Sequence, residues 1–270
     1  MTGPLITVDE LHAGLADVSV LDVRYRMGGP PGRDVYAAGH VPGAAYVDLD
    51  EDLAGDPGER GRHPLPDPLV LEGAMQRAGV WNDSPVVVYD DWVGRAAARC
   101  WWLLRWAGHV DVRVLDGGWS AWQAAGFATE EGDAAPEPGD FVVRPGQVPT
   151  VEVGDVVAHR GVLVDARAPE RYRGEVEPVD PVAGHIPGAV NVPTENNLTA
   201  DGRFRTPDEL RATYAAVGVE PGAEVAVYCG SGVTACHDIL ALAVAGVPAT
   251  LYPGSWSEWL ADPSRPVETG

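Results

Sequence analysis

The chain contains no lysine, since all 19 of its basic residues are arginine. A Schiff base to a substrate or to pyridoxal phosphate needs a lysine amine, and so does the phosphate-binding loop of P-loop NTPases. Both classes of protein are therefore excluded. The basic residues face 40 acidic ones, which gives a net charge of −21. Such an acidic surface repels nucleic-acid phosphates and anionic lipid headgroups, so we expect no nucleic acid and no membrane among the partners.

Cysteines and long hydrophobic runs are also scarce. Cys100, Cys229 and Cys236 are too few and too scattered for a disulfide framework or a four-ligand zinc site. The longest apolar stretch, residues 239–247, is far shorter than the roughly 20 residues that cross a bilayer. The N-terminus lacks the basic start and the apolar core of a secretory signal. These absences predict a cytoplasmic protein.

What the chain does have is an internal repeat. Its 270 residues, 45% of them hydrophobic and 22% charged, leave room for one large globular domain or two ordinary ones. Four segments recur in the same order and at a nearly constant spacing: 20–24 and 163–167, 39–44 and 184–189, 86–90 and 225–229, 118–122 and 255–259. The economical interpretation is two homologous domains.

The composition also predicts where the domains end. Residues 136–149 are rich in proline, glycine and acids, which is typical of a linker between an N-terminal domain, 1–135, and a C-terminal domain, 150–270. In each domain, short runs rich in valine, leucine and alanine alternate with helical patterns. The helical patterns lie at 67–78, 96–107, 207–216 and 234–245. This alternation predicts an α/β fold in which a mostly parallel sheet carries helices on both faces.

One cysteine has the sequence context of a nucleophile. The predicted strand 225–228 is followed by Cys229-Gly230-Ser231-Gly232-Val233-Thr234-Ala235 and then by a helix. Two glycines let the backbone curl so that its N–H groups point inward, and the N-terminus of the helix favours an anion. A thiolate at Cys229 is therefore stabilised. A cysteine phosphatase would need an arginine six residues after the cysteine, where this chain has Ala235, so phosphorus is not the expected target.

The first copy has Asp90 at the position of Cys229, and we therefore expect it to be inactive. Cys100 and Cys236 lie inside helical patterns and are predicted to be buried structural residues. Several other polar residues recur in both copies, including the one without a thiol, which favours a structural role for them. They are Asp22, Arg24, His40, Asp165, Arg167 and His185.

The repeated Gly-His-(Val/Ile)-Pro-Gly-Ala segments, the paired tryptophan motifs and the loop 229–234 together resemble the tandem-domain rhodanese superfamily, most of all its 3-mercaptopyruvate sulfurtransferases. The resemblance covers nearly the whole chain. It implies that Cys229 carries sulfane sulfur as a persulfide, without a metal or an organic cofactor. The donor would be a small anion, 3-mercaptopyruvate, and pyruvate would be released. The acceptor would be a thiol, such as thioredoxin or a small dithiol, or cyanide.

The resemblance also assigns residues to roles. It implies a proton relay of Asp50, His63 and Ser231, whose first two members come from the inactive copy, so that the site would lie between the domains. It gives Arg171 the carboxylate of the donor. The remaining predicted substrate-binding residues belong to the loop after the cysteine: Gly230, Gly232, Val233 and Thr234.

The sequence departs from the pattern at one position. Mercaptopyruvate enzymes usually carry a second arginine after a Glu-Pro pair, where this chain has Val179. Either another arginine replaces it or the donor differs. The candidates for a replacement are Arg60, Arg62 and Arg95.

Three alternatives stay open at this stage. A thiosulfate to cyanide sulfurtransferase would differ only in its donor. A binding or redox-sensing protein without catalytic activity would keep Cys229 as a switch. A cysteine hydrolase would need His63 or His237 as its base, but His237 lies about two helical turns beyond Cys229.

Overall fold

The computed structural model describes residues 3–270, and these form two compact units. The first contains the chain up to Gly55 together with Pro66–Gln147 and Asp201–Arg203. The second contains Asp56–Leu65, Val148–Ala200 and Phe204–Gly270. A short segment from the first half of the sequence therefore belongs to the second unit. The limits of the domains along the sequence stay a prediction.

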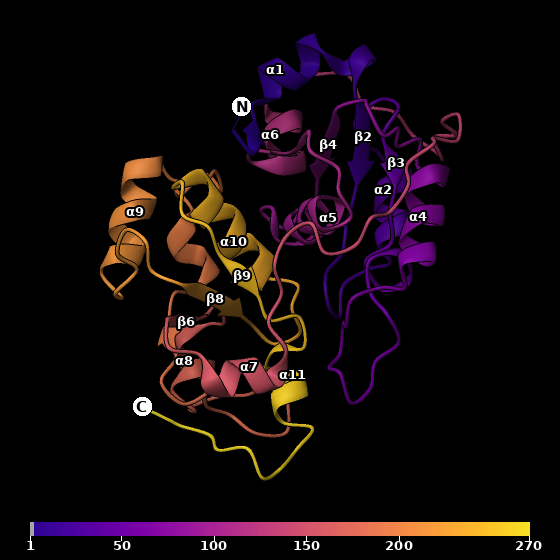
Figure 1. Cartoon of the computed structure of the whole chain (residues 1–270). Coiled ribbons are helices and arrows are strands. Elements are labelled where there is room, and N and C mark those ends of the chain that lie inside the picture. Colours follow the sequence, from indigo (N-terminus) through magenta and orange to yellow (C-terminus); the bar gives the residue numbers. More distant parts are fainter. Residues whose placement is uncertain (1–2) are drawn as a thin grey trace. The chain divides into compact units, whose positions relative to one another are not determined.

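The first unit is built on a five-stranded parallel sheet in the order β1-β5-β4-β2-β3, of which Figure 1 labels β2, β3 and β4. Its strands are β1 (Leu5–Ile6), β2 (Ser19–Asp22), β3 (Ala45–Tyr46), β4 (Val86–Tyr89) and β5 (Val112–Leu115). Its helices are α1 (Val8–Ala13), the 3-10 helix η1 (Leu15–Asp17), α2 (Gly32–Ala37), α3 (Leu49–Asp52), α4 (Pro68–Arg77), α5 (Arg95–Trp106) and α6 (Gly118–Ala124). Helix α5 packs against β4 and β5.

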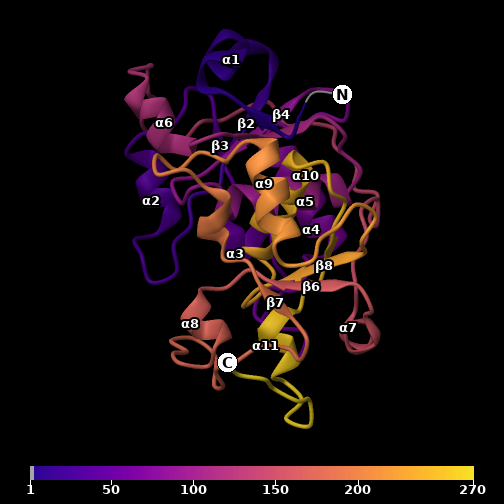
Figure 2. The same cartoon turned by 90° about the vertical axis from the view of Figure 1, so that its left-hand side faces the viewer.

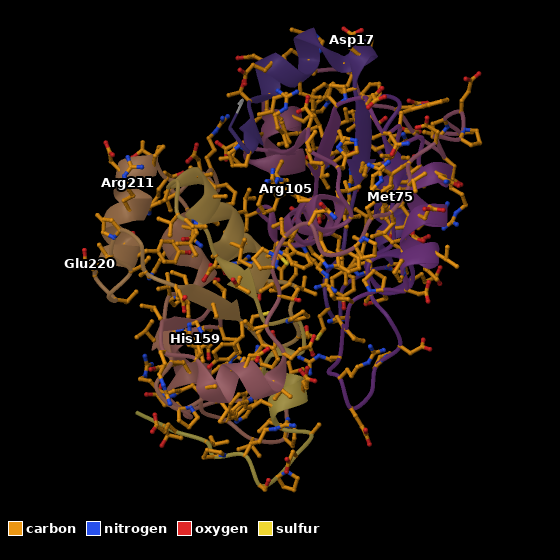
Figure 3. The ribbon with its side chains drawn as sticks, in the orientation of Figure 1. Asp17, Met75, Arg105, His159, Arg211 and Glu220 are labelled. Carbon is orange, nitrogen blue, oxygen red and sulfur yellow. The ribbon has the colours of Figure 1, made fainter. Side chains whose placement is uncertain are left out.

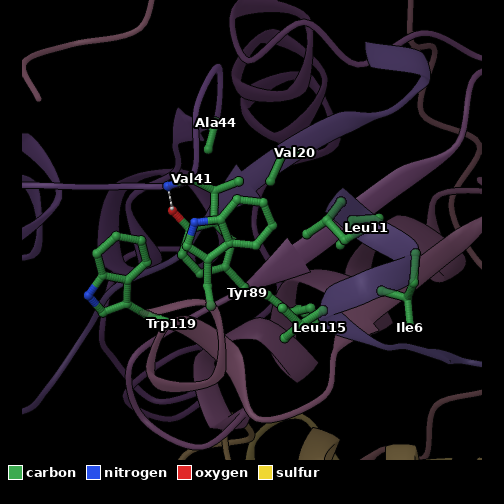
Figure 4. Packing of buried hydrophobic residues seen from close by; sticks show 11 residues of the cluster. Ile6, Leu11, Val20, Val41, Ala44, Tyr89, Leu115 and Trp119 are labelled. Atoms are coloured by element: carbon green, nitrogen blue, oxygen red, sulfur yellow. Dashed lines mark hydrogen bonds between the residues drawn. The ribbon is translucent and has the colours of Figure 1, made fainter. Parts of the chain in front are cut away.

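The core of the first unit joins residues from its whole length. Ile6 of β1, Val20 of β2 and Leu115 of β5 pack together in one buried cluster (Figure 4). Tyr89 ends β4 in the same cluster, and its hydroxyl accepts a hydrogen bond of 3.0 Å from the Val41 backbone N–H. This bond connects the repeated Gly-His-Val-Pro-Gly-Ala segment to the central strand. The segment is thus part of the frame of the unit.

The second unit repeats this plan with a four-stranded parallel sheet in the order β7-β6-β8-β9. Its strands are β6 (Val162–Asp165), β7 (Val190–Asn191), β8 (Val225–Tyr228) and β9 (Thr250–Leu251). Its helices are α7 (Val153–Ala158), α8 (Pro169–Tyr172), the 3-10 helix η2 (Thr194–Asn197), α9 (Pro207–Ala215), α10 (Ala235–Val244) and α11 (Ser255–Trp259). Helix α9 packs beside α10 (Figure 2).

The two sheets correspond strand by strand. Asp22 pairs with Tyr89 across β2 and β4, and Asp165 pairs with Tyr228 across β6 and β8. The counterpart of β1 is reduced to a single parallel bridge between Thr150 and Leu251. Tandem α/β units on parallel sheets, as the repeat predicts, are therefore confirmed.

The helices begin where the sequence provides a cap. Thr206 caps α9 in a capping box with Glu209, and Pro207 occupies the first turn, where its missing N–H costs no hydrogen bond. Asp67 accepts a hydrogen bond from the Leu69 amide at the start of α4, again with a proline in the first turn. The predicted patterns at 67–78, 96–107, 207–216 and 234–245 are confirmed as α4, α5, α9 and α10 to within about two residues.

The acid–arginine pairs that recur in both copies are buried in the frame. Arg167 binds both carboxylate oxygens of Asp165 and the carbonyl of Gly184, the last at 2.6 Å. Arg24 makes the equivalent contacts with Asp22 and the carbonyl of Gly39. Each guanidinium lies over a tryptophan ring of the final helix of its unit. The two arginines therefore hold the first residue of each Gly-His-x-Pro-Gly segment in place.

Exposed acidic residues occur in both units. Asp17 and Glu220 are exposed at the outer rim of the first and second unit, whereas Met75 of α4 is buried (Figure 3). Among residues 3–270, no helix is long and apolar enough to cross a membrane.

Candidate active site

Cys229 stands at the end of β8, in the loop that leads to α10, and only 1% of it is exposed. The start of α11 fixes its backbone. The Cys229 N–H donates to the hydroxyl of Ser255 at 3.1 Å, and its carbonyl accepts the N–H of Trp256 at 3.0 Å. Ser257 binds the carbonyl of Gly230 at the same distance. The repeated tryptophan motif therefore serves to hold the loop.

The sulfur of Cys229 accepts a backbone hydrogen bond. The N–H of Gly232 lies 3.1 Å from Sγ, as a loop that curls around its own cysteine requires. Gly230, Ser231 and Val233 are buried in the same loop, and Thr234 occupies the position before the first residue of α10 without a capping hydrogen bond from its side chain. Gly232 thus contacts the Cys229 sulfur directly, and its role toward a substrate stays a prediction. The roles of Gly230, Val233 and Thr234 stay predictions.

Gly232 is the position at which this curl depends on glycine. Its φ is +81°, and a Cβ there would lie 2.3 Å from the carbonyl oxygen of Pro253. Gly232→Ala should therefore destabilise the chain by more than the ~1 kcal/mol of a positive φ alone. Gly218→Ala is the matched control, because Gly218 has a φ of +94° and open space around it. Equal losses in urea unfolding of the two variants would show that the loop relaxes around the added methyl group.

His63 belongs to the same unit as Cys229 and not to the first unit, because the segment Asp56–Leu65 lies with the second. The segment is attached to α11. Gly61 packs closely on the carbonyl of Gly254, and the Arg62 N–H donates to Ser257 at 3.0 Å. His63 Nδ1 and the Ser231 Oγ are 2.7 Å apart, a hydrogen-bond distance. The structure therefore brings together Cys229, Ser231 and His63, although His63 lies in the stretch of sequence, residues 1–135, that is predicted as the N-terminal domain.

Asp50 lies in the first unit, in the short helix α3, whose first turn is capped by the side chain of Asp48. Burial raises the pKa of Asp50, and the neighbouring carboxylates of Asp48 and Glu51 raise it further. Its place in a relay with His63 stays a prediction.

Arg171 lies in α8 and is held by two acids. Its Nε and Nη2 bind the two oxygens of Glu177 at 3.1 and 2.7 Å, and Nη2 also lies 3.1 Å from Asp180. Burial disfavours ionised Glu177, but the hydrogen bonds from Arg171 and from the amides of Asp180 and Val179 outweigh it and lower its pKa. Glu177 therefore keeps its charge and fixes the guanidinium.

Of the three candidates for the missing second arginine, Arg62 is the one that lies close to Arg171. Arg62 Nη1 lies 2.5 Å from the Asp180 carboxylate, which thus bridges Arg62 and Arg171. Arg60 is exposed, and Arg95 belongs to the first unit. The sequence reasoning missed Asp180 and Glu177. The two acids are three residues apart with a proline between them, in the loop after the predicted binding residue Arg171. This pattern could have indicated that they contact Arg171.

The other cysteines and His237 have structural surroundings. Burial raises the pKa of Cys100 in α5. Cys236 is buried in α10, with its sulfur 3.3 Å from the carbonyl of Gly232. His237 is fully buried, stacks on Phe204 and contacts Asn197. These contacts do not present it to the Cys229 sulfur as a base.

The first unit has a corresponding loop with a different occupant. Asp90 follows β4 as Cys229 follows β8, and its oxygens accept the N–H groups of Trp92, Gly94 and Ala97 at 2.8, 2.8 and 2.9 Å. Its carbonyl accepts the N–H of Trp119, as that of Cys229 accepts Trp256. Burial raises the pKa of Asp90, and the three hydrogen bonds, which lower it, offset only part of this rise. The repeated loop is therefore built to present N–H groups to an acidic side chain.

No group of three or more His, Cys, Asp or Glu side chains that could hold a metal ion occurs among residues 3–270.

Comparison with known proteins agrees with this architecture. The family model described as the rhodanese-like domain matches twice, over residues 7–125 and 152–262. The solved Escherichia coli 3-mercaptopyruvate sulfotransferase SseA superposes with a TM-score of 0.85 at 35% identity, over 95% of this chain and 100% of that one.

Curated relatives are similar along their whole length. A Pseudomonas aeruginosa protein named probable 3-mercaptopyruvate sulfurtransferase is 48% identical over 98% of this chain and 98% of its own. A Mycobacterium tuberculosis protein, provisionally named thiosulfate sulfurtransferase SseB, is 48% identical over 98% of this chain and 97% of its own. The relatives thus carry the enzyme type that the sequence predicts, with two different donors in their names.

Proposed function

The chain belongs to the rhodanese-like domain family, and we propose that it transfers sulfane sulfur from 3-mercaptopyruvate through a Cys229 persulfide to a thiol acceptor or cyanide. The observation that carries this proposal is the geometry at the cysteine. Cys229 accepts the Gly232 N–H within an anion-binding loop, and the hydroxyl of the neighbouring Ser231 is hydrogen-bonded to His63. A nucleophile and a route for a proton therefore lie side by side.

In the first step, the Cys229 thiolate attacks the sulfur of the donor. A sulfur–sulfur bond forms, and the donor's carbon–sulfur bond breaks with its electron pair left on the carbon of the pyruvate enolate. The proton that the donor thiol carried moves to that carbon through Ser231 and His63, so that pyruvate leaves and an ionised persulfide remains. No external oxidant or reductant is needed, because the transferred sulfur is oxidised to the sulfane level while the donor's methylene carbon is reduced to the methyl group of pyruvate.

The loop stabilises the persulfide that results. Its terminal sulfur carries the negative charge and needs N–H donors that are already in position. The corresponding loop of the first unit supports this, because there the carboxyl group of Asp90 accepts three backbone N–H groups. In the second step, an acceptor thiolate attacks the terminal sulfur and regenerates the Cys229 thiolate.

The same site leaves thiosulfate as the second candidate donor, which one of the similar relatives has in its name. The charges around Arg171 favour mercaptopyruvate. Arg62 and Arg171 are matched by Glu177 and Asp180, so the site offers N–H donors without a surplus of positive charge. A monoanionic carboxylate suits such a site better than a dianion.

The acceptor and the location follow from the same proposal. A reduced thioredoxin or a small dithiol fits a site that gives up one sulfur atom to a thiolate, and we propose a cytoplasmic setting, where such thiols stay reduced. Asp50 is proposed as the third member of the relay. The alternative is a redox-sensing role without catalysis. The experiment below distinguishes it from sulfur transfer.

The test is a single-turnover reaction of reduced protein with 3-mercaptopyruvate and, separately, with thiosulfate, followed by intact-mass spectrometry and localisation to the Cys229 peptide. We expect one added sulfur atom on Cys229 from mercaptopyruvate, together with one equivalent of pyruvate. Addition from thiosulfate alone would keep the reaction and replace the donor. Addition from neither would favour the redox-sensing role.

A further inference from the structure

One serine at the start of α11 has a backbone conformation that serine rarely adopts. Ser255 has a φ of +53°, and within residues 3–270 Val93 is the only other residue besides glycines with a positive φ. A side chain in this left-handed region costs free energy, and proteins keep such a residue mainly where function requires it. Ser255 is also fully buried. The reason for its side chain must therefore lie in its contacts.

The first unit has the same backbone conformation without a side chain. Gly118 begins α6 as Ser255 begins α11, and its φ is +56°. A Cβ on Gly118 would lie 2.4 Å from the carbonyl oxygen of Asp90, which is well inside the contact distance of the two atoms. The loop of the first unit thus lies closer to its helix than a serine would allow. In the second unit, the Cβ of Ser255 keeps the loop of Cys229 further away.

The hydroxyl group of Ser255 joins the nucleophile to the residue after β9. It accepts the N–H of Cys229 at 3.1 Å and donates to the carbonyl of Tyr252 at 3.0 Å. Tyr252 is in turn held to β8, because its N–H donates to the carbonyl of Val227 at 2.9 Å. Without the hydroxyl, the N–H of Cys229, a residue that is only 1% exposed, would lose its acceptor. The loop would have to move to find another one.

From these contacts we propose that Ser255 is a positioning residue for Cys229: its Cβ sets the separation between the loop and α11, and its hydroxyl fixes the cysteine backbone at that separation. The fixed loop keeps the Gly232 N–H 3.1 Å from Sγ. The first unit, which has Asp90 in place of the thiol, has a glycine where the second unit has this strained serine. The proposal rests on the proposed function only for the role of Cys229 as the sulfur carrier, because the position of the thiol can be tested without sulfur transfer.

The test uses two variants that separate the contacts of Ser255 from its backbone strain. Ser255→Ala keeps the Cβ and the positive φ and removes the hydroxyl, whereas Ser255→Gly also relieves the strain. Ser255→Gly should therefore unfold at a higher urea concentration than Ser255→Ala. In both variants, neutral iodoacetamide should alkylate Cys229 about tenfold more slowly than in the wild type, because the Gly232 N–H no longer supports the sulfur. Peptide mass spectrometry follows the alkylation.

A residue that only stabilises the fold would give a different order of rates. Reactivity would then follow stability, and Ser255→Gly would react at or near the wild-type rate. Such a rate in Ser255→Gly, or an unchanged or faster rate in Ser255→Ala, would overturn the proposal. The control is Ser120→Ala, which removes a serine hydroxyl from an exposed position of α6, the equivalent helix, and should leave the rate within about twofold.

Sulfur transfer provides the second measurement. With mercaptopyruvate as donor, both variants of Ser255 should lower kcat about tenfold and leave KM within about twofold, because the fully buried Ser255 contacts the cysteine and not the donor. A rise in KM with an unchanged kcat would contradict the positioning role. If the wild type takes up sulfur from neither donor but alkylation slows in both variants, the proposed function fails and the positioning role stands.

Discussion

Cys229→Ser is expected to abolish persulfide formation and to lower turnover with any sulfur donor by at least about 10³-fold. The reason is the bond itself. A serine alkoxide is not available at neutral pH, and an oxygen cannot carry sulfane sulfur in an exchangeable sulfur–sulfur bond. Intact-mass spectrometry after a single exposure to donor should show no added sulfur, and stopped-flow measurement should show no burst of pyruvate.

The control for this variant is Cys100→Ala. Cys100 is fully buried in α5 of the first unit, and burial raises its pKa, so its thiol is not a nucleophile. Cys100→Ala should take up one sulfur atom at the wild-type rate. Retention of sulfur uptake by Cys229→Ser, for instance on Cys236, would mean that the carrier lies elsewhere on the chain.

Local features of the site could be predicted from the sequence. The strand before the cysteine, the glycine-containing loop and the helix after it are all encoded within about twenty residues, and β8 and α10 lie where the pattern places them. The repeat predicted two α/β units for the same reason, because each copy contains its own strands, turns and helices. Local periodicity decides such elements, since every residue that specifies them is near in the chain.

The contacts that complete the site could not be predicted in this way. Arg62 and Asp180 are 118 residues apart, and His63 and Ser231 are 168 apart. Nothing in the local pattern of residues 56–65 indicates that this segment belongs to the second unit. Only the resemblance pointed to His63. The bridge formed by Asp180 could not be predicted, because a carboxylate in so acidic a chain is expected at the surface.

The comparison of the two copies shows which contacts of the loop are shared by both units and which residue differs between them. Both loops have their first carbonyl bound by a tryptophan N–H of the final helix, and both sheets carry the same buried acid–arginine pair. Asp90 and Cys229 occupy the same position in that frame: one is a buried carboxyl group that accepts three backbone N–H groups, and the other is a buried thiol that accepts one.

The second large effect is expected at the proton route. Ser231→Ala and His63→Gln should each slow persulfide formation by about 10²-fold, because the enolate must then take its proton from water instead of a positioned donor. Cys229 and its amide loop remain in both variants, so one sulfur atom should still be added in the end. The measurement is the rate of the pyruvate burst, followed beside the final mass.

The double variant decides whether the two residues act as one unit. Because the 2.7 Å contact between His63 and Ser231 makes each depend on the other, Ser231→Ala/His63→Gln should be no more than about threefold slower than either single variant. His159→Gln, a histidine of the same unit that ends α7, should keep the wild-type burst. Multiplicative losses in the double variant would mean that His63 and Ser231 act separately, with His63 serving the donor directly and Ser231 only supporting the loop.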